Sequence, residues 1–161
     1  MKLTVITTGG TIDKVYFDAE SDYQIGDPQI AEILKGFNVA MEFDVKPLMR
    51  KDSLELTDAD RDLIYQAAVD AEADKIIITH GTDTMVQTAN RLTAIPGKTI
   101  VLTGALNPAR FVGSDAVFNI GCALGAVQTL PPGAYVIMNG RVWDPAHVRK
   151  NRAENRFVEV P

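Results

Sequence analysis

Short apolar runs alternate with helical segments along most of the chain, and this order constrains the fold more than any other feature. The runs KIIIT (residues 75–79) and TIVLT (99–103) have wholly apolar centres, which is typical of parallel strands covered on both faces. Further strands are predicted at residues 2–8, 39–48 and 134–138, and helices at 28–35, 57–71, 83–92 and 114–129. The sequence therefore predicts a single α/β domain over residues 1–161, with a mainly parallel sheet and helices on both faces in a three-layer sandwich.

Two segments carry no such periodicity. Residues 11–27 have no regular apolar pattern and include a glycine and a proline near their end, which predicts a long loop. Loops of this length in compact domains are commonly functional lids. Residues 149–161 are polar and rich in arginine, and we expect a tail or docking arm there.

Composition excludes several classes of function. A net charge of −5 disfavours nucleic acid or a membrane as partner, and no run approaches the roughly 20 apolar residues of a membrane span. The single cysteine, Cys122, excludes a disulfide framework, and the first residues do not resemble a signal peptide, so we expect a cytoplasmic protein. Phosphate-loop, dinucleotide and zinc patterns are absent, so we predict no cofactor and no metal. His80 is interpreted as a hydrogen-bonded residue at a strand end.

Hydroxyls and glycines follow three of the predicted strands. They occur in TTGGT (residues 7–11), HGTD (80–83) and TGA (103–105). Ligands of open parallel sheets bind beyond the carboxyl ends of the strands, where these segments meet. Taken singly, each has a simpler explanation as a turn, a helix cap or a solvated surface, and the residues alone do not name a reaction.

Two of these segments resemble a known family. TTGGTI (residues 7–12) and ITHGTDTM (78–85), each directly after a predicted strand, resemble the two signatures of bacterial L-asparaginases. The segments TGA (103–105), DAVFN (115–119) and MNG (138–140) are similar to later landmarks of that family, so the resemblance covers most of the chain. Typical members carry a smaller second domain after a linker, and this sequence ends where that linker would begin. The resemblance therefore implies the short, single-domain form.

The resemblance also implies roles for individual residues. Thr11 matches the nucleophilic threonine of the first signature, and Tyr23 resembles the lid tyrosine beside it. Thr82 and Asp83 match the second threonine and the substrate-binding aspartate, and Lys150 matches the lysine that polarises this threonine. Either threonine is a candidate for the acyl-enzyme. The expected substrate-binding residues are Gly10, Asp52, Ser53, Gly81 and Ala105.

The predicted function is hydrolysis of L-asparagine to L-aspartate and ammonia by a homo-oligomer, either a dimer or a tetramer. Three alternatives stay open at this point. They are a non-catalytic amino-acid-binding module, an amidohydrolase that prefers glutamine or another amide, and a structural component of an amidotransferase assembly.

Overall fold

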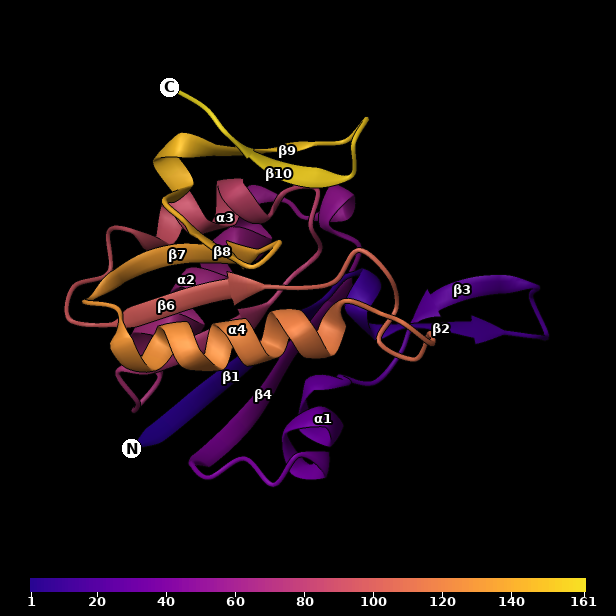
Figure 1. Cartoon of the computed structure of the whole chain (residues 1–161), viewed down its shortest axis with the longest axis horizontal. Helices are drawn as coiled ribbons and strands as arrows, with labels where there is room; N and C mark the ends of the chain where they lie inside the picture. Colours follow the sequence, from indigo (N-terminus) through magenta and orange to yellow (C-terminus); the bar gives the residue numbers. More distant parts are fainter.

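The computed structural model describes residues 1–161 and is built around one six-stranded sheet (Figure 1). Its strand order is β4-β1-β5-β6-β7-β8, in which neighbouring strands are parallel except for the antiparallel pair β7 and β8. The prediction of a mainly parallel sheet is therefore confirmed. The strands are β1 (Lys2–Gly9), β4 (Glu42–Lys51), β5 (Lys75–Thr79), β6 (Thr99–Thr103), β7 (Gly133–Met138) and β8 (Arg141–Trp143).

Helices cover both faces of the sheet, which confirms the three-layer prediction. Helices α2 (Asp58–Asp70) and α3 (Met85–Leu92) pack on one face, and α1 (Ile30–Gly36) and α4 (Ala116–Thr129) on the other. Side chains alternate between these two cores along each strand, so that Ile76 and Ile78 face α2 and α3 while Ile77 faces α4. This alternation explains why the central strands are continuously apolar in sequence.

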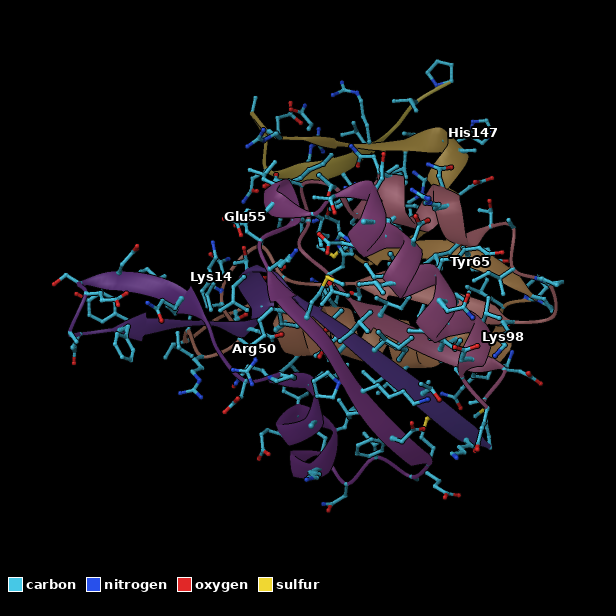
Figure 2. The ribbon with its side chains drawn as sticks, turned by 180° about the vertical axis from the view of Figure 1, so that it is seen from behind. Lys14, Arg50, Glu55, Tyr65, Lys98 and His147 are labelled. Carbon is cyan, nitrogen blue, oxygen red and sulfur yellow. The ribbon has the colours of Figure 1, made fainter.

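The expectation of a long loop at residues 11–27 is wrong. A 3₁₀ turn, η1 (Thr11–Asp13), leads into an antiparallel hairpin of β2 (Lys14–Phe17) and β3 (Asp22–Ile25), in which Tyr16 lies opposite Tyr23. The hairpin projects from the body of the molecule (Figures 1 and 2). Because most of its side chains are exposed, no buried stripe marked its strands in the sequence.

The polar segment at the end of the sequence also differs from expectation, because it is not a loose tail. Residues 149–161 complete a hairpin of β9 (Val148–Asn151) and β10 (Arg156–Glu159), preceded by the 3₁₀ turn η3 (Pro145–His147). Val148 and Phe157 are buried in the same core as α2 and α3. The hairpin thereby holds Lys150 over the body of the protein rather than in solvent.

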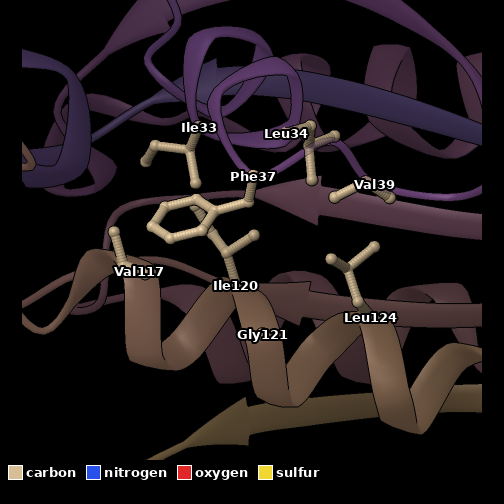
Figure 3. A pocket seen from close by; sticks show the side chains of 8 residues that line it. All are labelled: Ile33, Leu34, Phe37, Val39, Val117, Ile120, Gly121 and Leu124. Atoms are coloured by element: carbon tan, nitrogen blue, oxygen red, sulfur yellow. The ribbon is translucent and has the colours of Figure 1, made fainter.

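An apolar hollow of about 240 Å³ lies between α1 and α4, on the face of the sheet opposite α2 and α3 (Figure 3). Seven of its eight lining residues are hydrophobic, and none is one of the predicted site residues. No helix in the structure combines the length and apolarity needed to cross a membrane.

Candidate active site

The carboxyl ends of β1 and β5 touch through their glycines. Gly10 has a φ of 88°, and a Cβ atom added there would lie 2.5 Å from the backbone nitrogen of Gly81. A Cβ on Gly81 would lie 2.6 Å from the Cβ of Ser53. Only glycine fits this backbone conformation and this spacing. Thr11 and Thr82 directly follow the touching glycines, so the structure brings the two candidate threonines to neighbouring strand ends.

Thr82, Asp83 and Lys150 form one hydrogen-bonded cluster. The Lys150 Nζ atom lies 2.6 Å from Thr82 Oγ1 and 2.8 Å from Asp83 Oδ1. Thr82 is only 5% exposed and the Lys150 side chain 11%, so this amine sits largely out of water. The Arg152 Nε atom lies 3.4 Å from the same Asp83 oxygen. The hairpin of β9 and β10 thus delivers both cations to the loop after β5.

Thr11 and Tyr23 line one open cavity of about 370 Å³. Its remaining walls come from Lys14, Asp22, Pro108 and Phe111. The Tyr23 ring packs edge-on against Tyr16, with centroids 5.4 Å apart, and against Phe111 at 5.8 Å. No hydrogen bond joins Tyr23 to Thr11, so the hairpin places the phenol beside the threonine without fixing it there.

The two clusters open into separate hollows. Asp83 and Lys150 line a second cavity of about 210 Å³, which Thr11 and Tyr23 do not reach. Backbone contact at Gly10 and Gly81 is what connects the two halves. A substrate that uses both threonines must therefore lie across these glycines.

Ser53 and Asp52 lie in the 3₁₀ turn that follows β4. Ser53 is buried, its hydroxyl accepts a hydrogen bond from the Thr84 backbone nitrogen at 3.3 Å, and its carbonyl oxygen accepts one from the Thr84 hydroxyl at 2.8 Å. Asp52 caps the turn by accepting from Leu54 N at 3.0 Å and lies 3.5 Å from the Lys14 amine. Ser53 is thus held against Gly81, whereas Asp52 faces the base of the hairpin.

Ala105 has a different environment from the other predicted residues. It is 1% exposed and packs in the core with α4, and it lines neither cavity. The structure therefore groups Gly10, Ser53, Gly81 and the charged cluster, but leaves Ala105 beneath the site.

Several residues of the site were not predicted from the sequence. Thr84 anchors Ser53, Phe111 supports the Tyr23 ring, and Arg152 is a second cation on Asp83. Thr84 stands inside the second signature and was a reasonable candidate for this reason. Phe111 and Arg152 lie in polar or glycine-containing segments whose position depends on tertiary packing, so the sequence held no comparable signal for them.

Known proteins resemble this chain over nearly its whole length. The family model for the N-terminal region of asparaginases matches residues 2–157. This chain belongs to the asparaginase family. It is 31% identical over 159 residues to the L-asparaginase of Thermococcus kodakarensis, covering 93% of this chain and 48% of that protein. It is also 33% identical over 138 residues to one component of the glutamyl-tRNA(Gln) amidotransferase of Thermoplasma acidophilum, covering 80% of this chain and 33% of that protein.

Solved structures of asparaginases share the fold. The thermostable L-asparaginase from Thermococcus kodakarensis superposes with a TM-score of 0.87 at 29% identity, over 99% of this chain and 51% of that one. L-asparaginase I from Vibrio cholerae gives a TM-score of 0.84 at 26% identity, over 98% of this chain and 51% of that one. This asparaginase-family chain thus spans about half the length of the L-asparaginases that it matches.

Proposed function

We propose that this chain is an amidohydrolase that converts L-asparagine to L-aspartate and ammonia through a threonine nucleophile. Membership of the asparaginase family supports the reaction class. One observation carries the proposal: an amine lies 2.6 Å from the Thr82 hydroxyl, at the strand end that touches the turn before Thr11. A hydroxyl, an amine and a carboxylate in such contact are the groups that activate a weak oxygen nucleophile.

Access to substrate favours Thr11 as the nucleophile. Thr11 is half-buried and lines the larger cavity, whereas Thr82 is almost completely buried. In the proposed reaction, Thr11 Oγ1 attacks the side-chain amide carbon of asparagine, and Tyr23 helps to remove the hydroxyl proton. The carbon–nitrogen bond breaks, the departing nitrogen takes up a proton and leaves as ammonia, and an aspartyl ester remains on the threonine. Water then hydrolyses the ester to release aspartate.

The cluster around Thr82 supplies the second half of the chemistry. Lys150 donates a hydrogen bond to Thr82 Oγ1, which leaves the threonine's own proton available to a water or to the substrate. We assign this cluster to positioning the water that cleaves the ester. In the alternative, the roles are exchanged and Thr82 attacks the amide. Lys150 would then stabilise the negative charge that develops on Thr82 Oγ1.

Asp83 and Ser53 are proposed to hold the ends of the amino acid. Lys150 and Arg152 both contact Asp83 Oδ1, so Oδ2 is left to accept the substrate's α-ammonium. The Ser53 hydroxyl lies against Gly81, where it can donate to the α-carboxylate. Each contact gains strength where water is excluded.

A second candidate substrate is glutamine or a larger amide. The similarity to a component of a glutamyl-tRNA(Gln) amidotransferase favours this alternative, and the cavity beside Thr11 is open to solvent. Turnover of asparagine, glutamine and an aspartyl peptide, measured side by side, separates the candidates. Binding of aspartate without any ammonia release would instead indicate a binding module.

Ammonia release by the purified protein tests the proposed function. We expect asparagine turnover to be lost in Thr11→Ala and in Thr82→Ala, with folding retained. Thr129→Ala, an exposed threonine at the end of α4, is the matched control and is expected to behave as the wild type. Turnover that persists in both site variants, or is absent from the wild type, contradicts the proposal.

We also propose a cytoplasmic, homo-oligomeric protein. The single cysteine, Cys122, is free and has no partner within the chain for a disulfide. This supports the proposal of a reducing compartment. Light scattering at several protein concentrations tests the oligomeric state, and a monomer at micromolar concentration contradicts it.

A further inference from the structure

A line of three side chains runs beneath the peptide between Gly81 and Thr82. His80 follows β5 and is completely buried. Its Nδ1 atom lies 2.7 Å from the Gly81 carbonyl oxygen, and its Nε2 atom lies 2.8 Å from Thr88 Oγ1 in α3. The Arg61 Nε atom, in α2, lies 3.3 Å from the same hydroxyl.

The proton positions along this line follow from the partners. A carbonyl oxygen only accepts hydrogen bonds, so Nδ1 of His80 carries the proton. Burial, assisted by the nearby charge of Arg61, lowers the pKa of His80 to about 4, which keeps the ring neutral at pH 7. Nε2 is therefore an acceptor, Thr88 donates to it, and Arg61 donates to Thr88. With both nitrogens occupied and no exposure, His80 is not a general base.

This line of donors determines where the Thr82 backbone N–H points. In a trans peptide the C=O and the following N–H point in opposite directions. Because His80 holds the Gly81 carbonyl, the Thr82 N–H is aimed away from α3. That N–H donates no hydrogen bond within the chain, although Thr82 is almost completely buried. Gly10 and Ser53 pack closely against Gly81, at the start of this peptide.

We propose that His80, Thr88 and Arg61 are positioning residues that hold the Gly81–Thr82 peptide so that its N–H stabilises the oxyanion formed on the substrate amide. Thr88 has the deciding part, because its hydroxyl occupies Nε2 and fixes the orientation of the ring whose Nδ1–H donates to the Gly81 carbonyl. This inference rests on the proposed function, since the oxyanion exists only during amide hydrolysis.

Thr88→Val and Thr88→Ser form the first matched pair of variants. Valine keeps the shape of threonine but cannot donate to Nε2, whereas serine retains the hydroxyl. Loss of a whole oxyanion donor lowers kcat by roughly 100- to 1,000-fold, and a donor that is misaimed rather than lost has a smaller effect. We therefore expect kcat to fall at least ten-fold in Thr88→Val, with KM within two-fold of the wild type, and to stay within three-fold in Thr88→Ser.

His80→Asn and His80→Gln form a second pair, in case a buried valine at position 88 disturbs folding. The asparagine amide can occupy the place of Nδ1 and donate to the Gly81 carbonyl, whereas the glutamine amide reaches toward Thr88. We expect the asparagine variant to retain the higher kcat of the two. The reverse order would overturn the proposed role of the Gly81 contact.

Nitrogen-15 NMR of the imidazole ring reads the tautomer without any substrate, and the chain has only one other histidine, His147. We expect the proton on Nδ1 in the wild type and also in Thr88→Val, because the Gly81 carbonyl selects this tautomer in both. A wild-type proton on Nε2, or an active wild type whose Thr88→Val variant keeps full kcat, overturns the positioning role alone. A wild type that releases no ammonia while its ring shows the expected tautomer overturns the proposed function instead.

Discussion

Replacing Lys150 with methionine separates the chemistry of the site from its stability. Methionine has similar length and keeps the apolar stem in place, but it removes the Nζ atom that contacts Thr82 at 2.6 Å and Asp83 at 2.8 Å. The charge of Asp83 is not left isolated, because its side chain is 22% exposed and Arg152 stays 3.4 Å away. The free energy of unfolding should therefore fall by only about 1 kcal/mol, well short of the cost of stranding a buried charge.

Catalysis should respond far more strongly than stability. Loss of a group that positions and activates the attacking water raises the barrier by about 3–4 kcal/mol, which corresponds to a fall in kcat of roughly 100- to 1,000-fold. Ammonia release measures the rate, and urea denaturation measures the stability of the same preparations. Arg152→Met is the matched comparison, because it removes the other cation from Asp83 without touching Thr82, and we expect a loss of no more than about five-fold.

Two results would refute this reasoning. If Lys150→Met retains kcat within three-fold of the wild type, the amine has no part in the reaction. If Arg152→Met loses as much activity as Lys150→Met, the effect belongs to the total charge around Asp83 and not to contact with Thr82.

Three further predictions concern the framework of the site. Gly10→Ala must place a methyl group 2.5 Å from the Gly81 nitrogen at a φ of 88°, so activity should be lost and the melting temperature lowered; an active, fully stable variant would show that the two turns do not touch. Phe157→Ala should lower the free energy of unfolding by about 3–5 kcal/mol in urea titrations, because the ring is buried in the main core; a change below 1 kcal/mol would make the last hairpin a loose arm. Burial raises the pKa of Asp13 from 3.8 to about 6, so the stability that its protonated form contributes is present below pH 3.8 and lost as the pH rises through 6. Asp13→Asn does not titrate, so its free energy of unfolding should rise relative to that of the wild type by up to about 3 kcal/mol between pH 4 and pH 7. A difference in unfolding free energy that does not change with pH would contradict this.

The sequence predicted the sheet well because its strands lie between two cores. Ile76, Ile77 and Ile78 all require burial, and only a strand covered on both faces provides it for consecutive residues. The two hairpins escaped prediction for the opposite reason. β9 and β10 each bury one side chain deeply, Val148 and Phe157, and one buried residue per strand gives no periodicity.

The candidate site was chosen by resemblance more than by physical pattern. Lys150 stands 68 residues from Thr82, and no spacing rule connects them. The contact forms because Phe157 anchors the hairpin that carries the lysine, a consequence of tertiary packing. The approach of Gly10 to Gly81 also depends on tertiary packing. The glycines themselves indicated only that the backbones after β1 and β5 can approach a ligand closely.

The most direct measurement of the central claim is mass spectrometry of the protein quenched in acid during turnover of asparagine. Peptide mapping should find an aspartyl ester on the peptide that contains Thr11, and this adduct should disappear in Thr11→Ala. Continued ammonia release with no ester on either Thr11 or Thr82 would contradict catalysis by a threonine nucleophile.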